Sequence, residues 1–276
     1  MIDKIVAIYG FIDDMLKAIK HKEDIQRRTK DAEVITIGII ASLFFAGNHD
    51  LTLAYCKENK IFTNVLSKSR FNRRIHKVDD IMVFIFGQLG DTLKELNTSM
   101  HYRMDCFPIK VCHNIRIARC KILPKDEEFR GKCVSKREYF YGVKVCLMTN
   151  ETGIPVEFSI VPGRWSDTRA MNSMFYDLPD GSNNTCDSGF TSYELEDILM
   201  EAQHIKHDTV RKSNSKRTEP PYVKYLKDQF RKYIETVISN ITRIIPTRIH
   251  ATTFEGFLLK LKFWIWSYTF DKCASE

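Results

Sequence analysis

The chain has 276 residues, 43% of them hydrophobic and 12% aromatic, which is enough for one large domain or two moderate ones with a sizeable core. Its net charge of +7 suits a nucleic-acid partner without proving one. None of its eight cysteines forms a Cys-x-x-Cys pair, which disfavours a common zinc pattern or a disulfide scaffold and favours reduced thiols in the cytoplasm. Because the apolar stretches fall short of the roughly 18 residues of a spanning helix, no membrane partner is predicted.

Residues 1–97 are predicted to be helical. Helices are predicted over 5–19, 31–47, 50–62 and 67–96. Asp31 is the predicted N-cap of the second helix. A short helix, a turn and a helix with a basic start are typical of a helix-turn-helix DNA reader. Its candidate DNA-binding residues are Arg70, Arg73, Arg74 and Lys77, and the alternative is a helical packing domain with a solvated basic end.

From residue 98 onward, strands alternate with helices. Strands are predicted over 99–105, 137–150, 154–163, 183–187 and 204–210, and helices over 166–178, 191–203, 222–245 and 252–270. This order predicts one α/β domain over 98–276, with an antiparallel component and the C-terminal helix included. The helix over 222–245 is predicted to bury one stripe, made of Val223, Leu226, Phe230, Tyr233, Val237 and Ile241.

Two aspartates stand at predicted strand ends. Asp105 ends the first strand and Asp187 the fourth, so the two meet at one edge if these strands are neighbours. Glu235 lies midway along the helix over 222–245, which can pack across that edge. Three carboxylates suit two-metal phosphoryl transfer, because Mg²⁺ prefers oxygen ligands. Alternatively, Asp105 simply ends a strand, Asp187 is a turn residue, and Glu235 forms an i,i+4 pair with Arg231.

The segment from residue 203 to residue 250 holds eleven Lys and Arg against four Asp and Glu. Its loop supplies candidate contacts to a DNA backbone, since cations neutralise phosphates. These candidates are Arg211, Lys212, Lys216 and Arg217, joined by Arg231 on the following helix. A solvated basic face is the alternative.

Seven blocks carry a resemblance to a known family. They are "LSKSRFNRRIHKV", "MDCFPIKVCHNIRI", "GKCVSKREYFYGVKVCL", "GIPVEFSIVPG", "CDSGF", "RKSNSKR" and "RKYIETVISNI". Together they resemble bacterial insertion-sequence transposases, and in particular the insertion-sequence nine-eight-two family, over nearly the whole chain.

The resemblance implies an α/β fold, a ribonuclease H-like mixed sheet with flanking helices, preceded by an all-helical N-terminal DNA-binding domain. It implies a catalytic Asp-Asp-Glu triad, Asp105, Asp187 and Glu235, that binds two Mg²⁺ or Mn²⁺ ions. It further implies double-stranded DNA partners, namely terminal inverted repeats and target DNA. A homodimer or higher assembly on DNA, at the nucleoid of a bacterial cytoplasm, is expected.

The chain departs from the family pattern around the triad. The departures are Cys146 and Ser166 in place of His, Ser188 in place of Lys, His113 in place of an acid, and Asp228 and Thr242 at the outer positions of a Tyr-Arg-Glu-Lys signature. They leave two alternatives to an active transposase: a catalytically impaired relative that represses by binding DNA, and a ribonuclease H-like nuclease that cuts without joining.

Overall fold

The computed structural model describes residues 1–133, 137–174 and 176–274, and it divides into two compact units. One unit consists of Met1–Phe86 with Ile241–Glu276, and the other of Gly87–Asn240. The C-terminal helix therefore groups with the N-terminal helices, whereas the sequence analysis placed it in the domain over 98–276. Residues 134–136, within one of the quoted blocks, and residue 175, within the predicted helix over 166–178, lie outside the described residues.

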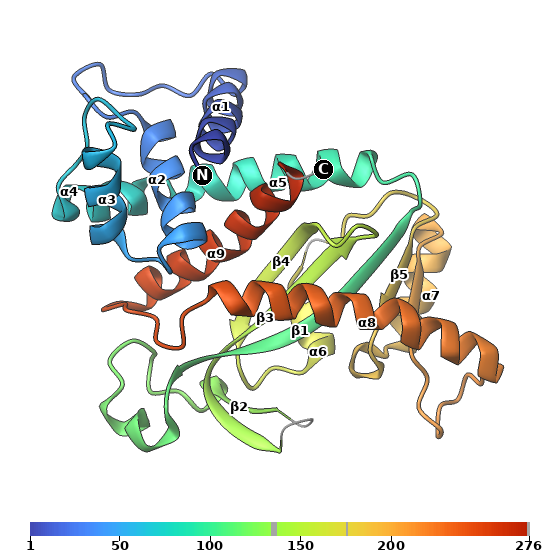
Figure 1. Cartoon of the computed structure of the whole chain (residues 1–276). Helices are drawn as coiled ribbons and strands as arrows, with labels where there is room; N and C mark the ends of the chain where they lie inside the picture. Colours follow the sequence, from blue (N-terminus) through green and yellow to red (C-terminus); the bar gives the residue numbers. More distant parts are fainter. Residues whose placement is uncertain (134–136, 175, 275–276) are drawn as a thin grey trace. The chain divides into compact units, whose positions relative to one another are not determined.

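The first unit is all-helical (Figure 1). Its helices are α1 (Ile2–Ala18), α2 (Asp31–Phe44), α3 (His49–Glu58), α4 (Lys68–Lys77), the start of α5 (Asp79–Glu95) and α9 (Phe254–Cys273). Helices α2 and α9 form its centre, since nearly all residues of α2 are buried and Trp264 and Trp266 of α9 are almost fully buried. A Cβ at Gly38 would lie 2.5 Å from Phe263, so glycine permits this close helix contact.

The predicted helix over 67–96 is in fact two helices, α4 and α5, separated at Val78. The second helix begins with Asp79 and Asp80, and acidic residues stabilise a helix N-terminus. Asp79 also accepts a hydrogen bond from Lys262 Nζ of α9 at 2.7 Å. The break thus gives α5 its own start and fastens that start to the unit's core.

Asp31 is the first residue of α2 and not its N-cap, which is Lys30. Its buried carboxylate contacts the His21 ring at 3.0 Å and two arginines, Arg27 at 3.2 Å and Arg74 of α4. This one carboxylate therefore ties the α1–α2 loop and α4 to the start of α2.

The second unit contains a six-stranded sheet of mixed direction within the described residues. Its strands are β1 (His101–Cys112), β2 (Arg130–Cys133), β3 (Glu138–Asn150), β4 (Pro155–Pro162), β5 (Asn183–Cys186) and β6 (Lys206–Thr209). β3 pairs antiparallel with β1, β2 and β4, whereas β1–β5 and β5–β6 are parallel. The predicted α/β arrangement with an antiparallel component is therefore confirmed.

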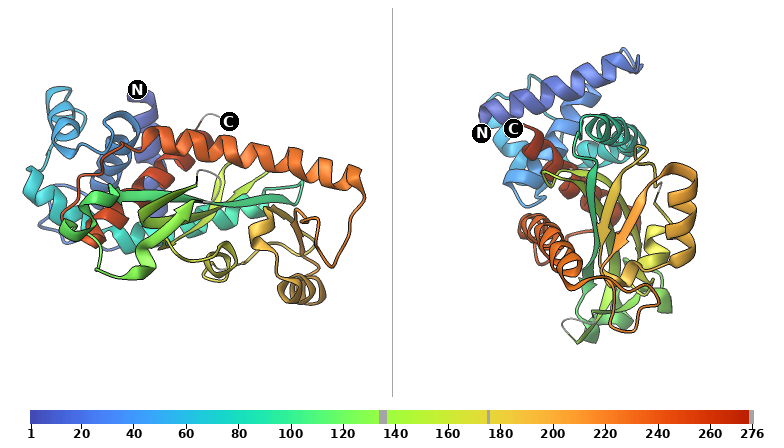
Figure 2. Two further views of the ribbon diagram at one scale, coloured as in Figure 1. Left: turned by 90° about the horizontal axis from the view of Figure 1, so that it is seen from below. Right: turned by 90° about the vertical axis from the view of Figure 1, so that its right-hand side faces the viewer.

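Helices cover both faces of this sheet. The right-hand view of Figure 2 shows the strands between α8 (Pro221–Ile244) on one side and α7 (Tyr193–Gln203) on the other. On the α7 side, a buried cluster includes Met104, Met148, Met171, Phe190 and Leu199. Helix α6 (Asp167–Met171) contributes to this cluster and is shorter than the predicted helix, with Ser166 as its N-cap.

Strand β1 runs seven residues beyond its predicted end at Asp105 and includes Pro108. The sequence prediction was wrong because proline was read as a terminator. Pairing with β5 stops at Met104, whereas pairing with β3 continues past Pro108. Proline is tolerated where one edge of a strand has no ladder to complete. Asp105 therefore lies within a long, rigid strand.

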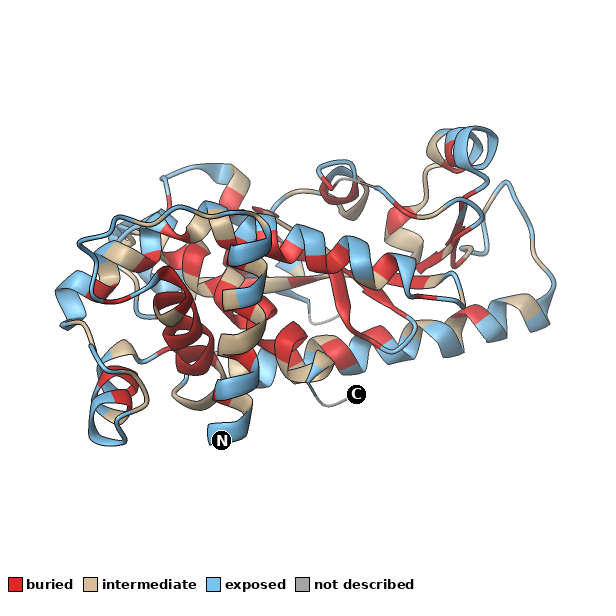
Figure 3. Cartoon of the chain, turned by 90° about the horizontal axis from the view of Figure 1, so that it is seen from above, coloured by how far each residue is buried: buried red, intermediate tan, exposed pale blue. Residues whose placement is uncertain are grey.

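Helix α8 buries a different stripe from the predicted one. Val237 and Ile241 are buried as predicted, together with Ile234 and Lys227, but Leu226, Phe230 and Tyr233 are exposed. In Figure 3, the long helix at the lower right is α8, and buried residues recur along one side of an otherwise exposed surface. The prediction weighed apolar character alone and missed that a buried lysine could take a place in the stripe.

No single helix among the described residues is long and apolar enough to cross a membrane. Helices α2 and α3 meet that test only when taken together, across a bend of 111°.

The Asp31 cluster should make the first unit sensitive to acid. Burial raises the pKa of Asp31, but hydrogen bonds from His21 and Arg74 and the charges of Arg74 and Arg27 outweigh burial and lower it. The stabilisation is therefore complete above the unfolded-state pKa of about 3.9 and is lost as the pH falls through the lower folded-state pKa.

We expect Asp31→Asn to reduce the free energy of unfolding by about 3 kcal/mol at pH 7, with a smaller deficit below pH 4, in denaturant titrations. Asp14→Asn, at an exposed position of α1, is the control and should change it by less than about 0.5 kcal/mol. Equal effects of the two variants at pH 7 would contradict the role of Asp31.

Candidate active site

The register of β1 and β5 places two aspartates side by side. Met104 pairs with Cys186 in the parallel ladder, so the next residues, Asp105 and Asp187, stand next to each other. Neighbouring strands lie about 4.8 Å apart, and side chains one residue beyond paired positions point to the same face. The two carboxylates thus meet on the α8 face at the end of β5.

Asp187 is both a turn residue and a member of this pair. It caps the 3₁₀ turn Ser188–Phe190, and its Oδ1 accepts the backbone N–H of Ser188 at 2.6 Å. Gly189 makes the turn compact, because a Cβ there would lie 2.5 Å from Asp167 Oδ2. The turn therefore fixes the Asp187 carboxylate and brings Asp167 to the same edge.

Glu235 reaches this edge from α8 through Arg231. The Arg231 guanidinium donates to Asp187 Oδ1 over 2.7 Å and to Glu235 Oε1 over 2.5 Å. The Arg231–Glu235 contact is the i,i+4 pair expected from the sequence, and the bridge to Asp187 is an addition that helical spacing does not reveal. Both carboxylates remain partly exposed, with side-chain exposures of 39% for Asp187 and 51% for Glu235.

The surroundings of Asp105 raise its pKa. Its burial raises its pKa to about 7, a hydrogen bond from the Cys106 N–H opposes the rise, and the negative charge of Asp187 adds to it. The positive charge of Arg231 lowers the pKa of Asp105, and the negative charge of Asp167 raises it. A group with such a pKa shift from burial and like charges is a candidate functional residue.

The three carboxylates fit a divalent cation by their chemistry. Oxygen donors suit hard cations, and the Arg231 guanidinium already stands as a cation between two of them. In this conformation their oxygens are not all within 4.8 Å of one another. Within the described ranges, the group that meets this spacing is His21, Glu23 and Asp31, and Asp31 is already engaged by His21 and by two arginines.

Helix α8 is held to the sheet by two buried cations. Lys227 Nζ contacts Asp208 of β6 at 2.5 Å and donates to the Thr209 carbonyl at 3.2 Å. Arg103 of β1 donates to the Phe230 carbonyl at 2.9 Å. These contacts set the place of the helix, and therefore of Glu235. Sequence reasoning missed both residues, although Arg103 precedes Asp105 by two positions on the same strand face.

The structure separates the candidate DNA-binding residues into two groups. Arg211 and Arg217 hold Glu196 at 2.7 and 3.0 Å, and Arg74 holds Asp31, so these three arginines are engaged in the fold. The side chains that are exposed and in no ion pair among the described residues are Arg70, Arg73, Lys77, Lys212 and Lys216. Arg231 lies at the carboxylates, as described above.

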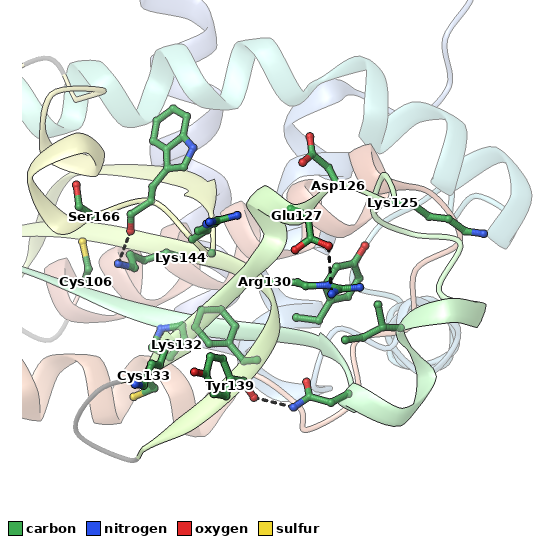
Figure 4. A pocket seen from close by; sticks show the side chains of 18 of the residues that line it. Cys106, Lys125, Asp126, Glu127, Arg130, Lys132, Cys133, Tyr139, Lys144 and Ser166 are labelled. Carbon is green, nitrogen blue, oxygen red and sulfur yellow. Dashed lines mark hydrogen bonds and ion pairs between the residues drawn. The ribbon is translucent and has the colours of Figure 1, made fainter.

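A cavity of about 1300 Å³ is lined by Cys106, labelled in Figure 4, and by Asp167 and Gly189, whereas Asp105, Asp187 and Glu235 are not among its lining residues. Five cationic side chains line it: Lys125, Arg130, Lys132, Lys144 and Arg164. Arg130 pairs with Glu127 at 3.1 Å and Lys144 with Asp167 at 2.7 Å. Lys132 instead lies over the exposed ring of Tyr139, 5.5 Å from its centroid. Sequence reasoning missed this basic surface because its residues come from separate segments.

Comparison with known families decides the identity of this fold. The model of the transposase DDE domain family matches residues 94–252, more than half of the chain, and the matched span contains Asp105, Asp187 and Glu235. The chain belongs to the DDE transposase family. A search of curated proteins and a search of solved structures each found no match.

Three of the departures from the family pattern have a clear place in the fold. Cys146 is fully buried and pairs across the ladder with Cys106, so it belongs to the core on the α7 side. Ser166 caps α6 through the Arg169 N–H, and Ser188 sits in the turn after Asp187. Each has a structural role, and none occupies the position of Asp105, Asp187 or Glu235. Cys56, Cys106, Cys112, Cys120, Cys146 and Cys186 are free thiols.

The raised pKa of Asp105 predicts that this carboxylate destabilises the DNA-free transposase. Its folded pKa of about 7 exceeds the unfolded value of about 3.9, so the folded state retains a proton that the unfolded state releases in this window. Stability therefore falls as the pH rises from 4 to 7.

Asp105→Asn should increase the free energy of unfolding by about 2–4 kcal/mol at pH 8 in chelator, with little gain at pH 4. Asparagine keeps an acceptor for the Cys106 N–H. The control Glu201→Gln, at an exposed site on α7, should change stability little at either pH. A loss of stability in Asp105→Asn at pH 8 would refute the prediction.

Proposed function

We propose that this chain is an active, metal-dependent DNA transposase that cleaves DNA at terminal inverted repeats and joins the freed 3′ hydroxyl to target DNA. The observation that carries the proposal is the placement of Asp105 beside Asp187, with Glu235 linked to that pair through Arg231. The strand order β4-β3-β1-β5-β6, with β3 antiparallel to the others, supports a ribonuclease H-like core. The seven sequence blocks support membership of the insertion-sequence nine-eight-two family.

Asp105, Asp187 and Glu235 would hold two Mg²⁺ or Mn²⁺ ions. Bound ions of this kind activate a nucleophile and stabilise the leaving oxygen in displacement at phosphorus. The chain's own contribution is placement. β1 and the turn after β5 fix the two aspartates, and the anchored α8 presents Glu235 to them. A rigid first set of ligands keeps the reacting phosphate in line with its nucleophile.

The DNA would follow the cationic surfaces that the fold leaves open. The cavity lined by Cys106 and Asp167 offers Lys125, Lys132 and Arg164 for phosphates, with Tyr139 as a stacking surface. Lys212 and Lys216 extend this set from the loop before α8. In the helical unit, the exposed Arg70, Arg73 and Lys77 of α4 support a second DNA contact, for the terminal repeat. A homodimer or larger assembly on paired ends, in a bacterial cytoplasm, completes the proposal.

Two other functions remain distinct in their products. A DNA-binding repressor would grip the repeat without cutting it, and the changed neighbours of the triad favour this alternative. A nuclease would cut without joining. Product analysis separates all three, because only a transposase yields a covalent joint between element end and target.

The conservative variants Asp105→Asn, Asp187→Asn and Glu235→Gln should each reduce cleavage of repeat-bearing DNA by about a thousandfold or more, because the three carboxylates act as a unit. Binding of the same labelled DNA should change by less than about threefold. Chelator should abolish cleavage by the unaltered protein. Specific binding without cutting in Mg²⁺ or Mn²⁺ would favour the repressor.

The cavity cations should contribute phosphate contacts. Lys132→Gln and Arg164→Gln should each reduce the slope of log binding constant against log salt by about one, as expected for one lost phosphate contact. Lys22→Gln, in the exposed α1–α2 loop, is the control and should leave the slope unchanged. Unchanged slopes in both cavity variants would place the DNA elsewhere.

A further inference from the structure

Arg231 occupies the space between two carboxylates that the proposed function needs for metal ions. Its Nη1 contacts Asp187 Oδ1 at 2.7 Å and its Nη2 contacts Glu235 Oε1 at 2.5 Å. Asp187 Oδ1 also accepts the Ser188 N–H at 2.6 Å, so this oxygen is engaged twice. Arg231 is therefore placed as a bridge that uses the lone pairs a cation would require.

The bridge is more than a surface ion pair. An isolated i,i+4 pair on a helix contributes only about 0.3–0.5 kcal/mol. Here, however, the guanidinium spans α8 and the end of β5, it is about three-quarters buried, and its positive charge also acts on Asp105. Its removal would leave Asp187 and Glu235 without an ion pair within the described residues.

Building on the function proposed above, we propose that Arg231 is a gate on metal binding: it closes the Asp187–Glu235 pair in the DNA-free protein, and a DNA phosphate opens it by drawing the guanidinium away. Arginine suits this exchange, because its planar fork binds carboxylates and phosphates through the same paired N–H donors. The released carboxylates then accept a divalent cation. Arg231 is thus a positioning residue that exchanges partners.

The exchange couples two binding events. If DNA relieves competition for the carboxylates, DNA strengthens metal binding, and by linkage the metal strengthens DNA binding by the same factor. A protein without the guanidinium has no competition to relieve. Its metal affinity should be high from the start and should depend weakly on DNA. The gate would thereby restrict cutting chemistry to a protein that is already on DNA.

Lys232 supplies a matched control. It lies next to Arg231 on α8, it is exposed, and it forms no ion pair within the described residues. Lys232→Gln removes the same unit of charge from the same helical turn. A general electrostatic effect would therefore appear in both variants, whereas a gate would appear in Arg231→Gln alone.

The test is a titration of the full chain with Mn²⁺, in which electron paramagnetic resonance measures the free ion. The titration is run once without DNA and once with a duplex that carries the flanking inverted repeat. Mn²⁺ binding by the duplex alone is subtracted. Without DNA, Arg231→Gln should bind Mn²⁺ about tenfold more tightly than the unaltered protein, and Lys232→Gln within about twofold of it. Arg231→Lys, which keeps a charge but cannot span both carboxylates, should lie between. DNA should tighten Mn²⁺ binding to the unaltered protein and leave Arg231→Gln nearly unchanged.

The inference is overturned if Arg231→Gln and Arg231→Lys both bind Mn²⁺ no more tightly than the unaltered protein without DNA, or if Lys232→Gln shows the same gain. Asp187→Asn separates this failure from a failure of the proposed function. If Asp187→Asn loses Mn²⁺ while the arginine variants gain nothing, the metal site stands and the gate falls. If the unaltered protein and the arginine variants all bind Mn²⁺ as Asp187→Asn does, with and without DNA, both the metal site and the gate are refuted. Circular dichroism at the assay temperature checks that each variant is folded.

Discussion

The repulsion between two neighbouring carboxylates is the constraint around which this site is built. A parallel ladder between β1 and β5 fixes Asp105 next to Asp187, and a strand cannot rotate its side chains apart without losing register. The pKa of about 7 at Asp105 reflects the burial of this carboxyl first, and the negative charge of Asp187 adds to the rise. The N–H groups of Cys106 and Ser188 and the Arg231 guanidinium offset part of it. A compact dication can offset more, because it can approach several oxygens at once.

Glu235 poses a different structural problem, because it comes from a helix. The position of a helix side chain relative to a strand end depends on how far the helix is shifted along its axis and how it is rotated about that axis. Two buried cations fix the placement of α8: its own Lys227 contacts Asp208 of β6, and Arg103, near the start of β1, donates to the Phe230 carbonyl of the helix. Since burial of a charge is costly unless it is paired, each cation enforces one placement of the helix. The remaining surface of α8 is free to carry exposed side chains.

The order of strands and helices was predictable from sequence, since alternation and helical periodicity mark β3, β4, α7 and α8 clearly. The adjacency of Asp105 and Asp187 was predictable only on the condition that their strands were neighbours, and the ladder now supplies that condition. The break at Val78 was not predictable from apolar spacing, because the stripe continues through it. The true extent of β1 past Pro108 was missed because the sequence does not show which edge of a strand stays unpaired.

The basic character of the segment between residues 203 and 250 has two parts, which composition alone merges. Lys206, Arg211, Arg217, Lys227 and Arg231 each face a carboxylate, so their charges are spent largely on holding β6, the loop and α8 in place. A distant phosphate responds to the net charge, whether or not the cations are paired. In the function proposed here, a bound phosphate is held by cations that can exchange water or a present partner for it, namely Lys212 and Lys216 in the loop, Lys132 in the cavity and Arg231 at the carboxylates. Attraction and grip therefore depend on different residues, and a sequence read for charge density identifies only the first.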